Sequence, residues 1–522
     1  MPVSAPAVTP EARKLAAYRW VPWSLLAAGF LARLVVARSV FLNPDEALHY
    51  LLSVQPSLAL TYRATLTTAH PPLLIVLLHY WSALGTSEWI LRLPSVAAGT
   101  AFCWMVFLWL ERVTDRTTAL IAFSLLLFSP ALIYLSAEVR QYALLQFLAA
   151  SSLYWLERGV GERSRRLMLW SALALYLALL SHYSALLVAL TLGVYGLARL
   201  RQAKSPAGVV AAWGIGEAGA LALVGFQFLT HIPMLKARGA PQAIADSYLR
   251  QSIFHRGEDN ALLFVTKNSL RFFHYLFSQG AVGAVGLLLF IVGIVLLIRD
   301  RKPAQDDTRP APRLLGLLLT FPLALNCALA LFAIYPFGGT HHNSYLAGFA
   351  MTGIAVSVAR WRILWAWVKP LLIGVVLALC NLFPSPSGGY IPAKDQDRGQ
   401  MQRAVKSLQA LPAGSTIFTD YQGALLLSYY LCPGLVTQVP CGAYRIVSIN
   451  PGEWTFRADT FTNLLLAMQR TQALPSGSKV WVFRAGWLTE NEEGLQAAIH
   501  RYRVGDQQKW GRNISLTPVQ MP

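Results

Sequence analysis

The sequence predicts a mainly α-helical, polytopic membrane protein with about 11 transmembrane helices and a small C-terminal α/β domain. Of the 522 residues, 55% are hydrophobic and 13% are charged, whereas a soluble domain carries about 25% charged residues. Apolar runs follow one another from residue 20 to residue 381, each roughly as long as a bilayer core requires. After residue 383 the composition returns to ordinary polarity.

The expected spans are the apolar runs at 20–40, 92–110, 117–135, 142–157, 167–181, 183–198, 208–230, 281–298, 314–334, 344–359 and 363–381. A further run at 71–84 is shorter and begins with two prolines, so we expect a surface helix in the first outer loop. If that run crossed the membrane, the basic loop at 158–166 would lie outside. The positive-inside rule favours eleven spans with a cytoplasmic N-terminus.

The net charge of +19 follows from the same rule. In a soluble protein such an excess would suggest nucleic acid, but cytoplasmic lysines and arginines produce it in a membrane protein. We therefore expect no nucleic-acid partner. Residues 1–19 form a predicted cytoplasmic segment without a cleavable signal, because the apolar stretch after Arg19 is too long for one. Residues 20–383 form the predicted membrane domain.

Residues 384–522 form a predicted extracytoplasmic α/β domain that follows a linker of sequence PSPSGG. An amphipathic helix is expected at 400–411, with short apolar strands at 416–419 and 479–484. Eleven spans place this domain outside.

Two cysteines of that domain, Cys432 and Cys441, have eight residues between them. They form either a disulfide or two free buried thiols, because spacing alone does not fix the geometry.

The predicted topology brings scattered polar residues to the outer face. These are Asp45, Glu46, His70, Glu138, Arg140, Tyr142, His182, Tyr183, Tyr335, His341 and His342. Ionisable groups at membrane depth usually mark a substrate path.

Asp45 and Glu46 directly follow the first apolar run, which places two carboxylates at the membrane surface. One reading is structural: a solvated turn that begins the next helix, with Asn43 or Asp45 as N-cap and Pro44 in the first turn. The other reading is catalytic. The residues themselves leave both open.

Five motifs, taken in order, carry a resemblance to a known family. They are the Asp45-Glu46 pair, HPPLL at 70–74, RLPS at 92–95, SAEVRQY at 136–142 and YPFGG at 335–339. Together they resemble the C-superfamily (GT-C) integral-membrane glycosyltransferases. The similarity is to the bacterial branch related to protein O-mannosyltransferases and to aminoarabinose transferases of lipid A.

The resemblance implies an enzyme that moves a sugar from a polyprenyl-phosphate carrier to an extracytoplasmic acceptor with inversion. The acceptor would be a protein hydroxyl, lipid A or an envelope glycan, and the enzyme would lie in the bacterial plasma membrane, among its lipids. Asp45 is the expected general base, and Glu46 would orient the acceptor or complete a polar network.

The leaving phosphate needs fixed positive charge, which Arg140 supplies bidentately. Arg140 also fits an interfacial anchor or a local pair with Glu138. Tyr142, His70 and His182 are further candidate phosphate ligands.

Tyr335, His341, His342 and Glu138 are candidates for additional contacts. In the aminoarabinose branch a metal-ligating acid lies near the position of His70. Here the preceding residue is Ala69, so the motif does not support a divalent metal, and we name no cofactor.

The longest outer loop, 231–278, carries six lysines and arginines. It fits a lid over an anionic substrate, or a long loop that escapes the positive-inside rule. The competing function is a transporter or flippase of a lipid-linked sugar. Transporters usually contain internal repeats, and no repeat relates the first six runs to the last five.

Overall fold

The computed structural model describes residues 20–237, 249–300, 308–361, 368–383, 396–432, 441–448, 458–471, 473–486 and 492–522. The predicted N-terminal segment 1–19, the linker and residues 238–248 of the long loop lie outside this range. The chain forms two compact units. The first comprises 1–36, 62–77 and 92–391, and the second comprises 37–61, 78–91 and 392–522.

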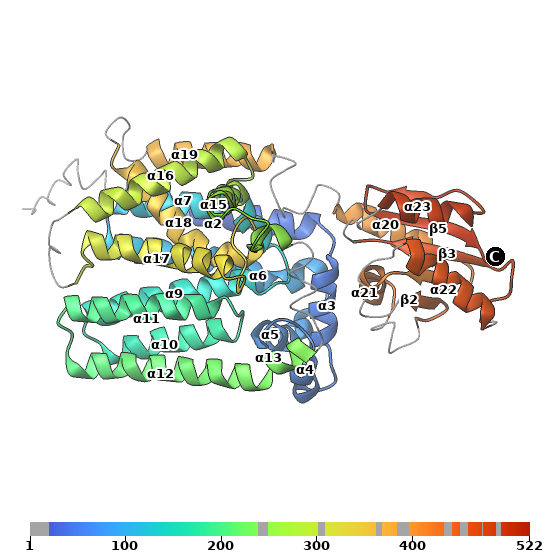
Figure 1. Ribbon diagram of the computed structural model, residues 1–522, viewed down its shortest axis with the longest axis horizontal. Helices are drawn as coiled ribbons and strands as arrows, with labels where there is room; N and C mark the ends of the chain where they lie inside the picture. Colours follow the sequence, from blue (N-terminus) through green and yellow to red (C-terminus); the bar gives the residue numbers. More distant parts are fainter. Residues whose placement is uncertain are drawn as a thin grey trace, which may run out of the picture. The chain divides into compact units, whose positions relative to one another are not determined.

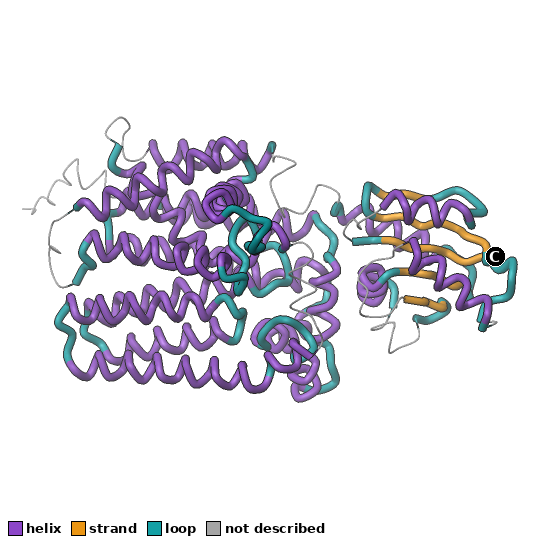
Figure 2. Tube along the Cα trace, in the orientation of Figure 1, coloured by secondary structure: helices purple, strands orange, loops and turns teal. Residues whose placement is uncertain are grey.

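The first unit is built from helices (Figures 1 and 2). Its helices are α2 (Val21–Ser39), α4 (Leu58–Thr65), α5 (Leu73–Trp81), α6 (Glu88–Val113), α7 (Arg116–Phe128), α8 (Pro130–Ser136), α9 (Tyr142–Gly161), α10 (Arg165–Leu179), α11 (Ala185–Gln202), α12 (Ala207–Thr230), α13 (Ile232–Ala237), α15 (Ala261–Phe277), α16 (Gly280–Arg299), α17 (Pro312–Leu331), α18 (Ala347–Ala359) and α19 (Val368–Leu382). Four of them, α2, α4, α5 and α6, have residues in both units. Short 3₁₀ helices of this unit are η2 (Arg250–Ser252) and η3 (His341–Leu346), whereas η1 (Ser82–Leu84) belongs to the second unit.

The chain is a multi-pass membrane protein, but the predicted count of eleven spans is not confirmed. In the described residues, five helices are long and apolar enough to cross a membrane: Val21–Ser39, Glu88–Val113, Ala207–Leu235, Gly280–Arg299 and Pro312–Leu331. The bent pair α7 and α8 makes a sixth if it counts as one span. Helices α10, α18 and α19 have only 15, 13 and 15 residues, fewer than the roughly 20 that a bilayer core requires.

The bend of 61° between α7 and α8 has a local cause. Pro130 begins α8 and has no N–H to continue the hydrogen bonding of α7. The buried side chain of Arg33 from α2 donates instead to the carbonyls of Leu127 (2.8 Å) and Leu126 (3.3 Å) at the end of α7. It also donates to Ser136 Oγ at 3.2 Å. An arginine in an apolar helix therefore satisfies the carbonyls that the break exposes.

The second unit contains a five-stranded mixed sheet in the order β2-β1-β3-β5-β4. Its strands are β1 (Thr416–Thr419), β2 (Arg445–Ser448), β3 (Lys479–Arg484), β4 (Gln508–Trp510) and β5 (Ile514–Gln520). Strands β1, β2 and β3 are parallel, and β5 pairs antiparallel with β3 and β4. The predicted strands at 416–419 and 479–484 are confirmed, as is the small C-terminal α/β domain.

Helices cover both faces of the sheet, and successive strand residues supply the two cores, as strand alternation requires. They are α3 (Pro44–Ser53), α20 (Arg398–Gln409), α21 (Tyr421–Tyr430), α22 (Ala458–Arg470) and α23 (Glu492–Arg501). Ile417 packs in the core with α3, α20 and α21. Phe418 packs in the core with α22 and α23.

Helix α3 belongs to this second unit, although its last residue, Ser53, lies 363 positions before Thr416, where the first strand begins. Its Ala47 and Leu51 are buried in one core with Leu425 and Leu426 of α21. The segment that carries Asp45 is thus part of the core of the C-terminal α/β domain.

Cys432, just after α21, and Cys441 form a disulfide with their Cα atoms 4.8 Å apart. The sequence left open whether these cysteines form a disulfide or remain free thiols, and the structure contains the disulfide. Cys432 directly follows the helix that packs against α3.

Candidate active site

Two groups of polar residues carry the chemistry that the sequence suggests, one in each unit. In the second unit, α3 begins with a capping box. Asn43 Oδ1 accepts from the N–H of Glu46 at 3.0 Å, and Glu46 Oε2 accepts from the N–H of Asn43 at 2.9 Å. Glu46 is 1% exposed. Its carboxylate therefore holds the start of the helix, while the neighbouring Asp45 is half-buried.

The approach to this helix is fixed by Tyr430, which the sequence did not single out. Its hydroxyl accepts from the N–H of Leu42 at 2.9 Å and donates to Glu88 Oε1 at 2.5 Å. Glu88 also pairs with Arg398 at the start of α20. Burial, followed by the charge of Glu88, raises the pKa of Tyr430 well above its usual value, so the phenol stays protonated and donates.

The loop after β3 also lies against the start of α3. Gly486 has φ +119, and a Cβ there would come within 3.0 Å of Pro44 Cγ and 2.5 Å of Gln422 Oε1. Only glycine adopts this conformation readily and leaves the space. The proline before Asp45 is therefore held by the sheet as well as by α21.

In the first unit, five rings from four separated segments form what we call the histidine cluster: His70, Tyr142, His182, His341 and His342. The ring centroids lie 5.6 Å apart for His70 and His182, and 5.2 Å apart for Tyr142 and His182. Tyr142 and His341 are 4.8 Å apart, and His341 and His342 are 4.3 Å apart. The structure thus brings together side chains that the sequence placed only on a common face.

Arg140 joins this cluster from the turn between α8 and α9. Its guanidinium carbon lies 5.1 Å from the centre of the Tyr142 ring, and Nη2 donates to the Tyr142 hydroxyl at 3.3 Å. Ser95 Oγ donates to the main-chain carbonyl of Arg140 at 3.4 Å. Arg140 is 4% exposed, so its charge lies in a largely dehydrated place.

Ser184, missed by the sequence analysis, connects three of the predicted residues. Its N–H donates to Nδ1 of His182 at 3.0 Å, and its hydroxyl lies 2.7 Å from the same atom. The hydroxyl also lies 2.5 Å from that of Tyr335, which donates to the carbonyl of His342 at 3.1 Å. Because Nδ1 accepts a main-chain N–H, neutral His182 carries its proton on Nε2.

A second hydrogen-bonded chain holds the segment of His70. His231, which follows α12, donates from Nε2 to the carbonyl of Thr68 at 2.9 Å and has Nδ1 2.5 Å from the hydroxyl of Tyr183. The N–H of Leu73 donates to the carbonyl of Leu180 at 3.0 Å. Both contacts tie 68–73 to the turn that carries His182.

Burial keeps three histidines of the cluster, His182, His341 and His342, neutral. Burial, and after it the charge of Arg140, lower the pKa of His182 to about 3. Burial also lowers the pKa values of His341 and His342 well below the usual value, with Arg140 and the neighbouring histidines adding to the effect. Arg140 therefore supplies fixed positive charge, and His182, His341 and His342 supply neutral N–H donors.

Glu138 is also buried, at 4% exposure. Burial and then Glu138 raise the pKa of Tyr275 in α15, while Arg140 lowers it. Glu138, Arg140 and Tyr275 are thus close enough to influence one another. In the described residues, no group of three or more His, Cys, Asp or Glu side chains is placed to hold a metal ion.

Eight of the ten predicted site residues, Glu138 included, lie in the first unit. Asp45 and Glu46 lie together in the second unit.

Residues 69–227 match the sequence profile of a family described as dolichyl-phosphate-mannose-protein mannosyltransferase. His70, Arg140, Tyr142 and His182 lie inside this match. No curated protein sequence matches the chain.

Solved structures extend the likeness to nearly the whole chain. ArnT from Cupriavidus metallidurans in the apo state has a TM-score of 0.52 and 13% identity, covering 96% of this chain and 98% of that one. The same protein bound to undecaprenyl phosphate has a TM-score of 0.51 and 14% identity over the same shares. An apo oligosaccharyltransferase from Archaeoglobus fulgidus has a TM-score of 0.44 and 12% identity, covering 79% of this chain and 64% of that one.

Residues 69–227 are thus similar to a mannosyltransferase family, and nearly the whole chain shares the fold of ArnT, an integral-membrane protein. Both findings agree with the resemblance that the motifs carry, and the activity is taken up in the proposal below.

Proposed function

We propose that this chain transfers a sugar from a polyprenyl-phosphate carrier to an acceptor outside the bacterial plasma membrane, with inversion at the anomeric carbon. The observation that carries the proposal is the histidine cluster around Arg140. One buried guanidinium surrounded by neutral ring donors suits a phosphodiester whose charge grows as the sugar leaves. The binding of undecaprenyl phosphate by the structurally similar ArnT supports a carrier of this class.

On the donor side, Arg140 would contact two phosphate oxygens, because a guanidinium offers parallel N–H groups in a plane. Tyr142 positions that guanidinium through the 3.3 Å hydrogen bond. The Nε2–H of His182 and the ring of His70 would supply further donors. His341, His342, Tyr335 and Glu138 would complete the surroundings of the same phosphate.

On the acceptor side, Asp45 would remove the proton from the attacking hydroxyl. The acceptor oxygen then forms a bond to C1, the bond from C1 to the phosphate oxygen breaks, and the electron pair leaves with the polyprenyl phosphate. General-base assistance of this kind contributes roughly 10²–10⁴ in rate. Glu46, whose carboxylate is held in the capping box, would position Asp45 and not act as a second base.

The proposed topology has eleven spans within residues 20–383, residues 1–19 in the cytoplasm and residues 384–522 outside. The positive-inside distribution of lysine and arginine supports it. Cysteines introduced as Arg166→Cys and Asp506→Cys test it with an impermeant maleimide on intact spheroplasts. Labelling should reach only the cysteine at 506. Labelling at 166 in intact spheroplasts would reverse the orientation.

Reconstitution distinguishes a transferase from a flippase of the lipid-linked sugar. Vesicles containing the full chain receive a radiolabelled polyprenyl-phosphate sugar and an envelope lipid extract. A transferase produces free polyprenyl phosphate and a new labelled glycoside, identified by mass spectrometry, and Arg140→Gln loses both. Movement of intact donor across the bilayer without any new glycoside would overturn the proposal.

A further inference from the structure

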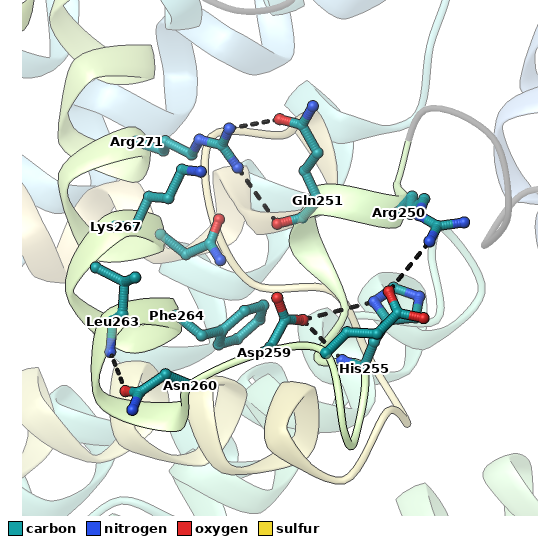
Figure 3. Close-up of a pocket in the computed structure, with 11 residues that line it drawn as sticks. Arg250, Gln251, His255, Asp259, Asn260, Leu263, Phe264, Lys267 and Arg271 are labelled. Atoms are coloured by element: carbon teal, nitrogen blue, oxygen red, sulfur yellow. Dashed lines mark hydrogen bonds and ion pairs between the residues drawn. The ribbon is translucent and has the colours of Figure 1, made fainter.

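A pocket of about 290 Å³ lies in the first unit, between the segment 250–260 and helix α15. It shares no residue with the histidine cluster. Its wall combines cationic and neutral polar side chains (Figure 3). The predicted lid loop, in its described part, thus contains a formed pocket.

Charge is separated along this pocket. At one end its two carboxylates are engaged: Glu258 pairs with Arg250 at 3.2 Å, and Asp259 lies 3.6 Å from His255 Nδ1. At the other end are Lys267 and Arg271. Within the described residues, no carboxylate forms an ion pair with either of these two cations.

Lys267 and Arg271 lie four residues apart on α15, on the same side of the helix, where like charges destabilise it. In Figure 3 both extend toward Gln251. Arg271 Nη1 donates to the main-chain carbonyl of Gln251 at 3.3 Å, and Nη2 donates to its side-chain oxygen. Burial alone lowers the pKa of Arg271. An anion bound between the two cations would offset their repulsion.

Asn268 provides an independent observation. It lines the pocket, is 1% exposed, and its Oδ1 has no hydrogen-bond partner among the described residues. Gly338 lies against it: at φ +135, a Cβ there would come within 2.7 Å of Asn268 Oδ1. A buried, unsatisfied carbonyl oxygen is costly. A ligand hydroxyl beside the anionic group would satisfy it.

The position of α15 points to a membrane lipid. In Figure 1, α15 is seen end-on, whereas α16 and α17 run across the view, so α15 lies crosswise to the spans of its own unit. Its leucines Leu262 and Leu263 are 77% and 64% exposed, next to the two cations. A helix with an apolar strip beside a basic strip lies in the membrane interface, with cations at the level of lipid phosphates.

We propose that Lys267, Asn268 and Arg271 bind the phosphate and an adjoining hydroxyl of a lipid acceptor at the membrane surface. The cations hold the phosphate, and Asn268 Oδ1 accepts from the hydroxyl. The acceptor role rests on the proposed transferase function, whereas the binding itself does not.

Binding is measured with the purified full chain in neutral detergent. The probes are dihexanoyl phosphatidic acid, dihexanoyl phosphatidylcholine, inorganic phosphate and polyprenyl phosphate. The wild type should bind the phosphatidic acid in preference to the phosphatidylcholine and inorganic phosphate. The double variant Lys267→Gln/Arg271→Gln should weaken this binding at least tenfold, and Asn268→Leu several-fold. Arg256→Gln, an exposed cation of the same loop outside the pocket, is the matched control.

Several results would overturn the assignment. Equal binding of inorganic phosphate would show a free-anion site, and equal loss in Arg256→Gln would show a diffuse basic surface. Loss of polyprenyl phosphate binding in the double variant would assign the pocket to the carrier. Lys267→Arg/Arg271→Lys keeps both charges, so retained binding there shows that the double variant fails through lost charge and not through misfolding.

Turnover separates this proposal from the function on which it rests. In the reconstituted system, the double variant should raise the KM for the lipid acceptor and leave the KM for the donor unchanged. Preferential phosphatidic acid binding with no glycosyl transfer at all would sink the proposed function and the acceptor role, and leave the lipid site. Transfer with an unchanged acceptor KM would exclude the acceptor role alone.

Discussion

The histidine cluster and helix α3, which carries Asp45 and Glu46, are built in opposite ways. The histidine cluster draws on four segments between residues 70 and 342, and its members meet only through tertiary packing. The start of α3 is organised by four consecutive residues, in which Asn43 and Glu46 cap each other. One region fixes a dehydrated charge, while the other fixes the direction of a helix.

This difference separates what each region would contribute to the proposed transfer. A leaving phosphate needs charge that is already in place and dehydrated, which the packed cluster around Arg140 would supply. An attacking hydroxyl needs a base at a defined position, which the capped helix α3 would supply through Asp45. We therefore expect substitutions in the histidine cluster to affect donor binding. On α3, we expect substitution of Asp45 to affect catalysis and substitution of the capping residues to affect stability.

The largest effect is expected from Asp45→Asn. If Asp45 is the base, kcat falls by roughly two to four powers of ten, while polyprenyl phosphate binding and the melting temperature stay unchanged. The capping box stays intact because it uses Glu46. The measurement is single-turnover transfer in the reconstituted system, with a binding assay in parallel.

Glu46→Gln is the matched comparison for that prediction. Glutamine also closes a capping box, so kcat should fall by less than about tenfold and stability should change by less than about 1 kcal/mol. An equal loss of kcat in both variants would remove the distinction between base and cap.

Arg140→Lys should come next in magnitude. Lysine keeps the charge but loses the planar pair of donors and the contact with the Tyr142 ring. Hydrogen bonds to a charged group contribute about 1.5–3 kcal/mol, so the donor KM should rise on the order of tenfold to a hundredfold. Donor titration in detergent checks this. A lysine variant with wild-type KM would show that Arg140 acts as a simple point charge or as an anchor.

The same contrast explains what could be predicted from the sequence. Hydropathy, the motif order and the start of α3 are local properties, so the helices, the Pro44 position in the first turn and the strands at 416–419 and 479–484 were predictable. Membership of α3 in the C-terminal core was not, because it depends on contacts of Ala47 and Leu51 with residues nearly 380 positions away.

The hydrogen-bond networks between side chains were also not predicted from the sequence. Ser184 and His231 gave no periodic or compositional signal, yet they hold His182 and the segment of His70. The count of eleven spans is not confirmed in the described residues. The apolar run at 344–359, for example, contains the end of the 3₁₀ helix η3 and then α18, which has 13 residues.

Tyr430→Phe tests the support of α3 and should affect stability. It removes the donor to Glu88 and the acceptor for the N–H of Leu42, so unfolding of the C-terminal domain should become easier by about 1–3 kcal/mol. Differential scanning calorimetry measures this. Tyr429→Phe is the control, because it loses the hydrogen bond to the Thr86 carbonyl at 2.6 Å, a cost of about 1 kcal/mol. A larger loss for Tyr429→Phe would shift the supporting role to that residue.

The smallest effect concerns the neutral histidines. The pKa of His182 lies at about 3 in the folded protein and near 6.5 in an unfolded chain, so the unfolded state binds more protons between these values. Its contribution to stability is therefore present above about pH 6.5 and is lost as the pH falls. Melting temperature should decline from pH 7 to pH 5. His182→Asn, whose Oδ1 can accept the N–H of Ser184 as Nδ1 does, should show a shallower decline. An unchanged slope would mean that His182 is hydrated and titrates normally, and the dry environment assigned to Arg140 would then be wrong.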